Sequence, residues 1–348
     1  MIKIEKVNEV YLRIYAEPGI EQELSEFFTF EVPGARFMPA FKAKIWDGKL
    51  RMYDLHRKTL YVGLLKYVQE FADRNCYKIE YMTPCTHQTN VTIEEVKEYT
   101  DWLNLHGRGE PIEARDYQLD AIYKALRDER VMLLSPTASG KSLMIYTIMR
   151  HHLEERRKCI LIVPTTSLVE QMYSDFKDYS TANGWRVDRH CQKLYSGFPK
   201  DFDADVLVTT WQSIYKQPAT WFKQFDVIFG DEAHQFKAKS LSTIMEKMTH
   251  VKYRIGTTGT LDNKKVHKLV LEGIFGPIYR VISTKELMDK GAVANLKIKC
   301  LVMKHDEITR KSRSKNEYAD EINFLVANEK RNKFIRNLAV SCEGNTLV

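Results

Sequence analysis

The segment Ser135–Ser142 (Ser-Pro-Thr-Ala-Ser-Gly-Lys-Ser) has the residue types and spacing of a phosphate-binding loop. It follows the apolar run Val131–Leu134 and opens a helical pattern over Lys141–Arg156. The first turn of a helix offers unpaired N–H groups and a positive dipole end to phosphate. We therefore expect a nucleotide to bind through Pro136, Thr137, Ala138, Ser139, Gly140, Lys141 and Ser142.

Two residues of this loop carry separate roles. The Lys141 ammonium group would reach the β- and γ-phosphates, and the Ser142 hydroxyl would ligate Mg²⁺. The alternative interpretation is an ordinary Ser/Gly-rich helix start that binds no ligand.

A second chemical feature, Asp231-Glu232-Ala233-His234, follows the strand-like run Phe225–Phe229. Ligand sites of open α/β sheets lie at the carboxyl ends of strands. Asp231 would hold Mg²⁺ through water, and Glu232 would orient and deprotonate the attacking water. With Lys141 they form the predicted catalytic set of an ATP hydrolysis site. The alternative is a pair of solvated acidic residues in a loop.

His234 stands close enough to Asp231 to sense the γ-phosphate and to relay its presence to a neighbouring strand. A surface histidine that bonds only solvent is the alternative.

The elements that must position these residues alternate along the chain. Strand-like runs and helical stretches follow one another from residue 113 onward, which predicts a parallel sheet with helices on both faces. The runs are Val131–Leu134, Cys159–Val163, Val206–Thr209, Val227–Gly230 and Arg254–Thr257. The fold class is therefore α/β, with a small α+β domain in front of it.

That first domain spans residues 1–82. Val10, Leu12 and Ile14 alternate as on a half-buried strand, Glu21–Phe28 suggests a short helix, and Gly48–Leu55 and Tyr77–Tyr81 read as strands. Apolar residues at 60, 64, 68 and 71 have helical spacing.

Residues 83–112 form a linker and a connecting helix. Thr92 and Glu95 fit a capping box, and His106-Gly107 is expected to end that helix.

The main nucleotide-binding domain is expected over 113–285, and 286–348 would form a connecting segment and the start of a further domain. We expect Lys304–Lys315 to be a flexible loop and 328–340 to be helical. Gly344-Asn345 is expected to turn into a strand at Thr346–Val348, which suggests a chain that continues into a partner domain.

Composition narrows the class of protein. The chain has 348 residues and a net charge of +7, which permits a nucleic-acid partner without requiring one. Six cysteines are scattered without close pairs, which indicates reduced thiols in a cytoplasmic location, with no zinc site and no disulfide frame. The first residues lack the apolar stretch of a signal peptide, and we expect no membrane span.

Basic and aromatic residues interleave over 36–58. Lys42, Lys44, Lys49 and Arg51 stand near Phe41, Trp46 and Tyr53. Cations suit phosphate and rings suit bases, so we expect a nucleic-acid surface here. The alternative is an aromatic core beneath a solvated charged face. The basic stretch Lys304–Lys315 allows the same two interpretations.

Six segments in order resemble the Q motif and motifs I, Ia, Ib, II and III of superfamily 2 DNA helicases, over about residues 113–285. Ser135 stands where the general phosphate-loop pattern has glycine, and Ala138 stands where superfamily 2 helicases commonly have another glycine. Trp46-Asp47-Gly48 and Thr209–Pro218 are also similar to recombination and branch-migration helicases of T-even bacteriophages. The six segments are Arg115–Gln118, Ser135–Ser142, Ile162–Thr166, Thr209–Ser213, Asp231–His234 and Gly256–Thr260.

The resemblance implies a RecA-like fold, ATP and Mg²⁺ as cofactors, and roles for further residues. Gln118 would bind the adenine edge with support from Arg115. Pro164, Thr165 and Thr166, and farther along Thr209 and Thr210, would contact nucleic-acid phosphates, although strand-end hydrogen bonding is the alternative for the threonines. Thr258, Gly259 and Thr260 would couple hydrolysis to motion through His234.

The family implies an ATP-dependent DNA helicase for recombination and repair, which acts as a monomer on branched or duplex DNA, or on RNA–DNA loops, in the cytoplasm of a host cell. Such motors need a second RecA-like half with an arginine finger, so this chain alone is expected to hydrolyse ATP weakly.

Three other functions stay open at this point. One is a duplex-DNA translocase that does not separate strands, another is a nucleic-acid-binding module with weak ATPase activity, and the third is a small-molecule P-loop kinase. The kinase would not predict the Q motif or Thr209-Thr210.

Overall fold

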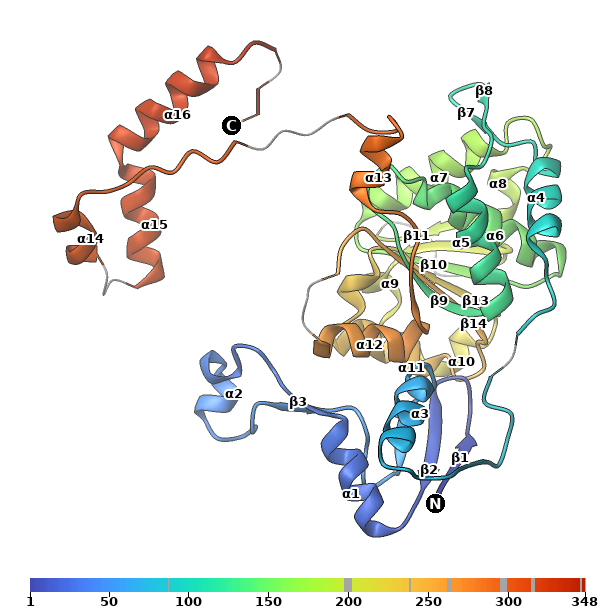
Figure 1. Cartoon of the computed structure of the whole chain (residues 1–348). Coiled ribbons are helices and arrows are strands. Elements are labelled where there is room, and N and C mark those ends of the chain that lie inside the picture. The colour runs from blue at the N-terminus through green and yellow to red at the C-terminus, as the bar shows by residue number, and fades with distance from the viewer. Residues whose placement is uncertain are drawn as a thin grey trace. The chain divides into compact units, whose positions relative to one another are not determined.

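A computed structural model describes residues 1–86, 88–196, 202–237, 239–261, 265–294, 299–313, 317–344 and 346–347. The chain forms two compact units, Met1–Val293 and Ala294–Val348, and we describe each by itself (Figure 1). The domain boundaries expected from the sequence at 82, 112 and 285 stay predictions, because packing alone divides the chain only after Val293.

The N-terminal part of the first unit is a four-stranded sheet with the order β5-β2-β1-β6. Alternate residues Ile2 and Ile4 of β1 and Leu12 and Ile14 of β2 are fully buried, which gives the sheet one core face. The strands are β1 (Ile2–Lys6), β2 (Tyr11–Tyr15), β5 (Thr59–Tyr61) and β6 (Ile79–Tyr81), and helices α1 (Pro18–Phe27) and α3 (Leu65–Arg74) follow β2 and β5.

The helix expected from Leu60 begins later than the spacing indicated. Leu60 lies in β5 opposite Leu12, so its burial comes from strand pairing, and a short 3₁₀ turn η2 (Val62–Leu64) precedes α3. A separate two-stranded sheet lies beyond this core. It comprises β3 (Thr29–Glu31) and β4 (Lys49–Arg51), with η1 (Ala35–Phe37) and α2 (Pro39–Lys42) between them.

The connecting helix α4 (Ile93–Trp102) begins as predicted. The Thr92 hydroxyl accepts from the Glu95 N–H at 3.2 Å, and the Glu95 carboxylate accepts from the Thr92 N–H at 2.7 Å. The predicted end was wrong. Asn104 has a φ of 44°, which stops the helix, and His106–Gly107 instead forms strand β7 against β8 (Glu110–Pro111).

The larger part of the first unit is a seven-stranded parallel sheet with the order β11-β12-β10-β13-β14-β9-β15, as the alternation of elements predicted. Two of its strands, β11 and β15, were not anticipated. The strands are β9 (Arg130–Leu134), β10 (Cys159–Val163), β11 (Cys191–Leu194), β12 (Val206–Thr210), β13 (Val227–Gly230), β14 (Tyr253–Thr258) and β15 (Ile278–Arg280).

Helices cover both faces of this sheet (Figure 1). Cys159, Leu161 and Val163 of β10 pack into one apolar cluster, whereas Ile160 and Ile162 pack into the other. A strand buried on both faces has to be apolar throughout, and β10 is. One face carries α5 (Asp116–Asp128), α6 (Lys141–Glu154) and α7 (Thr166–Tyr179), and the other carries α9 (Trp211–Ile214), α10 (Ala219–Phe222), η3 (Ala233–Lys237), α11 (Lys239–Lys247) and α12 (Lys265–Phe275).

The two sheets of the first unit meet at η2 and α12. A Cβ atom placed on Gly63 would lie 1.9 Å from the Glu272 carbonyl oxygen, so the backbones touch. Tyr61 donates to the Glu246 carboxylate and Tyr67 to the Glu272 carboxylate, each at 2.5 Å. These contacts hold the N-terminal module on α11 through Glu246 and on α12, the helix after the Gly256–Thr260 segment, through Glu272.

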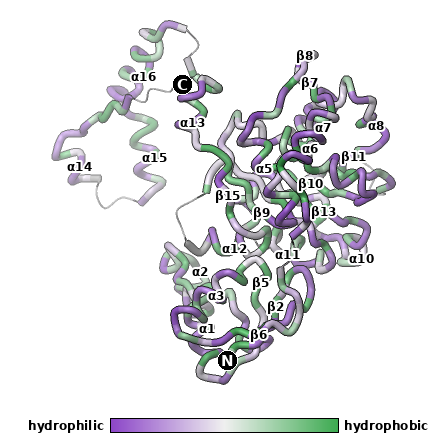
Figure 2. Tube along the Cα trace, turned by 45° about the vertical axis from the view of Figure 1, so that its right-hand side comes forward, coloured by the Kyte–Doolittle hydropathy of each residue, from purple (hydrophilic) through white to green (hydrophobic). Residues whose placement is uncertain are grey.

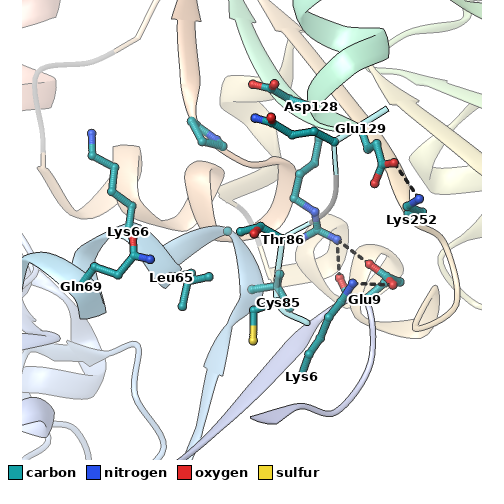
Figure 3. A pocket seen from close by; sticks show the side chains of 15 residues that line it. Lys6, Glu9, Leu65, Lys66, Gln69, Cys85, Thr86, Asp128, Glu129 and Lys252 are labelled. Carbon is teal, nitrogen blue, oxygen red and sulfur yellow. Dashed lines mark hydrogen bonds and ion pairs between the residues drawn. The ribbon is translucent and has the colours of Figure 1, made fainter. Parts of the chain in front are cut away.

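A cavity of about 210 Å³ lies at this junction (Figure 3). The Arg130 guanidinium donates to the Glu9 carbonyl and carboxylate at 2.8 and 3.1 Å, and Lys6 bonds the same carboxylate at 2.7 Å. Lys252 pairs with Glu129 at 2.6 Å on the other wall. The Arg130–Glu9 pair thus joins the two parts, while Lys252–Glu129 and Lys6–Glu9 neutralise charge within each part.

The second unit contains α14 (Glu307–Arg313), α15 (Tyr318–Ala327) and α16 (Glu329–Ser341). Figure 2 shows α14 as mostly polar and the later part of α15 as apolar. The helical prediction for 328–340 is confirmed, and Asn328 caps α16 through its bond to the Arg331 N–H. The prediction of a loop over Lys304–Lys315 was wrong for Glu307–Arg313, which form α14. The Asp306 carboxylate accepts from the Thr309 N–H at 2.8 Å and caps this helix.

Thr346 and Leu347 of the expected terminal strand have no regular structure, while Val348 of that strand and Asn345 of the expected turn lie outside the described residues. All six cysteines are free. Among the described residues, every helix is too short or too polar to span a lipid bilayer. Helix α13 (Thr284–Asp289) follows β15 in the first unit.

Candidate nucleotide and nucleic-acid sites

The sheet order brings three of the predicted segments together. Strands β13, β14 and β9 are neighbours, and all run parallel. Their carboxyl ends lead into Asp231-Glu232, into Thr258–Thr260 and into Ser135–Ser142, respectively. The acidic pair, the coupling segment and the phosphate loop therefore share one edge of the sheet, which is where ligands bind in this architecture.

The phosphate loop is held by a bond to β14 at its start and by a bond within it. The Ser135 N–H donates to the Thr258 carbonyl at 2.9 Å, and the Ser135 and Ser139 hydroxyls bond each other at 2.5 Å inside the loop. Thr137 and Ala138 are exposed at its tip. This arrangement leaves the turn open to a ligand on its outer side.

Two residues of the loop adopt left-handed backbone. Gly140 has a φ of 85°, a backbone conformation that favours glycine, and a Cβ atom there would also lie 2.2 Å from the Gln118 amide nitrogen. Ala138 has a φ of 66°, at the position where the helicase family commonly has glycine. The structure thus gives a reason for the family's glycine, and it shows that this chain keeps the turn at a cost in backbone strain.

Lys141 is the first residue of α6, and its side chain folds back over the loop. The Lys141 ammonium lies 3.4 Å from the Ser135 carbonyl and 3.5 Å from the Pro136 carbonyl. A Cβ atom on Gly259 would lie 3.7 Å from the same ammonium group. The coupling segment therefore packs directly against the lysine that is expected to contact phosphate.

The acidic pair is held by three neighbouring strands. The Asp231 N–H donates to the Ile162 carbonyl at 3.0 Å, and the Asp231 carboxylate accepts from the Thr257 hydroxyl at 2.6 Å. Asp231 is 3% exposed and Thr257 is 1% exposed. One carboxylate oxygen of Asp231 is thus fixed by the protein, which orients the other.

Glu232 and His234 connect this pair to the coupling segment. The Glu232 backbone has a φ of 47°, and its carboxylate lies 3.3 Å from His234 Nδ1. His234 Nδ1 also lies 3.0 Å from the Thr258 hydroxyl, which donates in turn to the Thr260 carbonyl at 2.9 Å. A chain of polar contacts therefore runs from the expected catalytic carboxylate to the segment after β14.

Ser142 does not face the acidic pair in this structure. Its hydroxyl bonds the Tyr179 hydroxyl of α7 at 2.8 Å. Burial raises the pKa of Tyr179 to about 12, so its hydroxyl stays protonated at neutral pH. Burial also raises the pKa of Asp175, which shares the Ser142 hydrogen bond.

The donor set still fits Mg²⁺. Asp231 and Ser142 supply hard oxygen ligands of the kind that Mg²⁺ prefers, and Mg²⁺ sites commonly add water and substrate phosphates to few protein ligands. Ser142 would have to turn away from Tyr179 to join such a site.

Gln118 lies beside the loop in α5. Its amide N–H donates to the Ser139 carbonyl at 2.8 Å, and its amide oxygen accepts from the Arg115 N–H at 2.8 Å. The Arg115 guanidinium donates to the Tyr117 hydroxyl at 2.9 Å. In this conformation the Gln118 amide positions the phosphate loop, so an adenine contact would require it to exchange those bonds.

The predicted nucleic-acid contacts divide into two groups. Thr165 and Thr166 are exposed at the start of α7 beside half-buried Pro164, and the Thr165 hydroxyl accepts from the Leu168 N–H at 3.3 Å. Thr209 and Thr210, by contrast, are buried, and their hydroxyls bond Leu194 and Ser213. Both hydroxyls thus serve strand-end hydrogen bonds, as the alternative interpretation expects, and a nucleic-acid contact by this second pair stays a prediction.

A hollow in the N-terminal module is lined by most of the predicted basic and aromatic residues, and we call this lining together with exposed Lys49 the basic–aromatic patch. Tyr53 is 1% exposed and packs in the core instead. Lys42, Lys44, Lys49 and Arg51 are all exposed. Arg51 pairs with Asp47 at 2.5 Å and lowers the pKa of Asp47 to about 2, so its charge is already compensated. The hollow is lined by Arg36, Phe41, Lys42, Lys44, Ile45, Trp46, Asp47 and Arg51.

Comparison with known proteins places the chain in a family. Residues 2–82 match the model of the N-terminal domain of the UvsW DNA helicase, and residues 111–263 match that of the type III restriction enzyme res subunit. The chain is 35% identical over 347 residues to the ATP-dependent DNA helicase UvsW of bacteriophage T4 and spans 68% of that protein. The chain belongs to the UvsW helicase family.

Other relatives agree with this assignment. A crystal structure of phage T4 UvsW superposes with a TM-score of 0.72 at 34% identity, covering 80% of this chain and 99% of that one. The DNA 3′-5′ translocase XPB2 of Sulfurisphaera tokodaii is 25% identical over 244 residues, which are 69% of this chain and 52% of that protein. The fold of this UvsW relative is therefore RecA-like, with a small sheet domain before it.

Two residues of this UvsW-family chain were missing from the predicted site. Thr257 fixes Asp231, and Tyr179 holds Ser142. Thr257 lies within the recognised Gly256–Thr260 segment. Because this segment ends β14, which pairs with β13, its position could have indicated a contact with Asp231. Nothing in the sequence marks Tyr179, because its contact depends on how α7 packs against α6.

Proposed function

We propose that this chain is an ATP-dependent DNA helicase that acts on branched DNA, including recombination intermediates and RNA–DNA loops. The observation that supports it best is the shared edge of β9, β13 and β14, where Lys141, Asp231 and Thr258 gather. The relative UvsW of phage T4 is named an ATP-dependent DNA helicase, which supports DNA as the partner of this chain.

In this proposal each group at the edge has one task. The phosphate loop and Lys141 hold the β- and γ-phosphates, and Mg²⁺ bound by Asp231 and Ser142 would neutralise charge that builds up during transfer. Glu232 orients the attacking water and accepts its proton. His234 then carries the change at the γ-phosphate to Thr258 through their 3.0 Å contact.

The track for DNA is proposed on two surfaces. Thr165 and Thr166 offer hydroxyls and the free N–H groups of the first turn of α7, which suit phosphate contacts that read no sequence. The basic–aromatic patch adds Lys42, Lys44 and Lys49 as phosphate contacts and Trp46 as a stacking surface. We assign Arg51 a smaller part, because Asp47 compensates its charge.

A second candidate is a translocase that moves on duplex DNA without separating strands. The match of residues 111–263 to the type III restriction enzyme model favours it. Both candidates use the same ATP site, and they differ only in what happens to the DNA strands.

Turnover by the 348 residues alone is proposed to be slow. Superfamily 2 motors close ATP between two RecA-like halves, and an arginine finger raises turnover by about 10³–10⁵-fold. The described residues of 113–293 form one such half.

Single-turnover phosphate release with protein in excess over ATP tests this function, because it detects slow hydrolysis. We expect release that forked or four-way DNA stimulates and that Glu232→Gln abolishes. Strand displacement from a forked duplex, measured beside displacement of a third strand from linear duplex, separates helicase from translocase. Hydrolysis that no DNA stimulates would contradict both candidates.

A further inference from the structure

A hollow of about 310 Å³ on the first unit gathers polar atoms that lack partners. Six buried side-chain nitrogen or oxygen atoms among the described residues have no hydrogen-bond partner. Three of them, Tyr99 Oη, His151 Nδ1 and His152 Nε2, belong to residues that line this hollow. Buried polar groups without partners are rare, and each asks for an ordered water or an ion.

Two of these residues and a carboxylate form a compact set of metal-ligand types. His151 and His152 lie in the last turn of α6, and Glu155 caps that helix. One ligand atom from each of the three side chains lies within 4.8 Å of the others. His152 is 1% exposed, so the packing of α6 holds its ring in place.

The guanidinium of Arg157 now provides the positive charge beside this set. It bonds His152 Nδ1 at 2.9 Å and pairs with Glu155, while it stacks 4.3 Å from the centre of the Tyr253 ring. A guanidinium can only donate hydrogen bonds, so His152 Nδ1 carries a lone pair. That lone pair and the Glu155 carboxylate are what a metal cation would use.

We propose that His151, His152 and Glu155 form a binding site for a divalent transition-metal ion of the Zn²⁺ class. Imidazole and carboxylate ligands suit Zn²⁺, Co²⁺ and Ni²⁺. The ion takes the place of the Arg157 guanidinium, and its bound water supplies a partner to Tyr99 Oη. None of the residues that line the hollow belongs to the phosphate loop or to the acidic pair. The site therefore fastens α4 and the end of α6 without entering the hydrolysis chemistry.

Co²⁺ titration of the chelator-treated 348-residue protein tests the proposal, with the visible d–d absorption as the readout and Zn²⁺ as the competitor. We expect one equivalent of Co²⁺ to give the band and saturating Zn²⁺ to raise the melting temperature. His151→Ala and Glu155→Gln should each weaken Co²⁺ binding by at least about 10-fold. Loss of a group that only supports a ligand already costs about that much in metal affinity, and these residues are proposed as ligands. His56→Ala, an exposed histidine of the N-terminal module, is the matched control and should bind as the parent does.

Arg157→Gln separates a metal site from a hydrogen-bond network. Removal of the competing cation should tighten Co²⁺ binding by about tenfold, which equals 1.4 kcal/mol. Melting curves in chelator show whether each variant is folded. The proposal is overturned if folded His151→Ala and Glu155→Gln proteins bind Co²⁺ as the parent does, or if the parent gives no band. The hollow then holds only water.

Discussion

Replacement of Thr257 by valine tests how the acidic pair is held. Valine has nearly the shape of threonine but lacks the hydroxyl that donates to Asp231 at 2.6 Å. Both residues are almost fully buried, so water cannot replace the missing donor. The variant therefore leaves a buried carboxylate with one hydrogen bond fewer, while the packing of β14 stays the same.

The expected magnitude follows from the charge of the acceptor. A hydrogen bond to a charged group contributes about 1.5–3 kcal/mol. We expect Thr257→Val to lower the free energy of unfolding by about 2 kcal/mol, which shifts the melting midpoint by roughly 4–8 °C for a unit of this size. Since Asp231 is also the proposed Mg²⁺ ligand, Mg²⁺-dependent nucleotide affinity should fall about tenfold.

Thermal melting and binding of a fluorescent ADP analogue with and without Mg²⁺ measure the two effects. Thr257→Ser is the matched control, because it keeps the hydroxyl and loses one methyl group, which costs about 1 kcal/mol. It should keep the Mg²⁺ dependence of the parent protein. If Thr257→Val matches Thr257→Ser in both measurements, the bond does not position Asp231 and this reasoning is refuted.

Three further substitutions test other contacts. Gly63→Ala places a methyl group 1.9 Å from a carbonyl oxygen of α12, so urea unfolding should show that the free energy of unfolding falls by about 1–3 kcal/mol. The control Gly19→Ala, where a methyl group meets open space, should show no such loss, and equal losses would contradict the close contact at the junction. Ala138→Gly removes left-handed strain of about 1–2 kcal/mol but adds chain entropy, so stability should rise by about 1 kcal/mol or less, and a clear loss would contradict the strain. Tyr179→Phe frees the hydroxyl of Ser142 to turn toward Mg²⁺, so Mg²⁺-dependent ADP affinity should rise, and a fall would show that the tyrosine supports the site.

Strands and helices with strong patterns were predictable from the sequence. β10 and β13 have continuous apolar runs that only a sheet covered on both faces can bury, and both were located within their observed bounds. β11 and β15 were not, because Cys191–Leu194 and Ile278–Arg280 are short and mixed in polarity. Their strand state comes from hydrogen bonding to β12 and β9.

The spacing of apolar and polar residues gave wrong predictions of secondary structure where a specific contact determines it. Leu60 fits a helical period, but its partner is Leu12 across a strand pair. The polar stretch before residue 313 was expected to be a loop, but Asp306 caps a helix there. In both cases a single specific contact outweighs the average pattern.

The sequence indicated which segments meet at the candidate site but not how their side chains lie. The order of the motifs, and the rule that ligands bind at the carboxyl ends of parallel strands, were enough to predict that Lys141 and Asp231 lie at one edge of the sheet. The rotamer of Ser142 and the inward bonding of Thr209 depend on packing against α7 and β11, which no local pattern encodes.

MgATP binding by the 348-residue chain tests the central claim most directly, since that claim is a phosphate site built at the shared edge of β9, β13 and β14. Equilibrium binding should be lost in Lys141→Ala and retained in Glu232→Gln, which keeps the loop and removes only the carboxylate that activates water. If Lys141→Ala binds MgATP as tightly as the parent protein, nucleotide does not bind at this edge and the account is wrong.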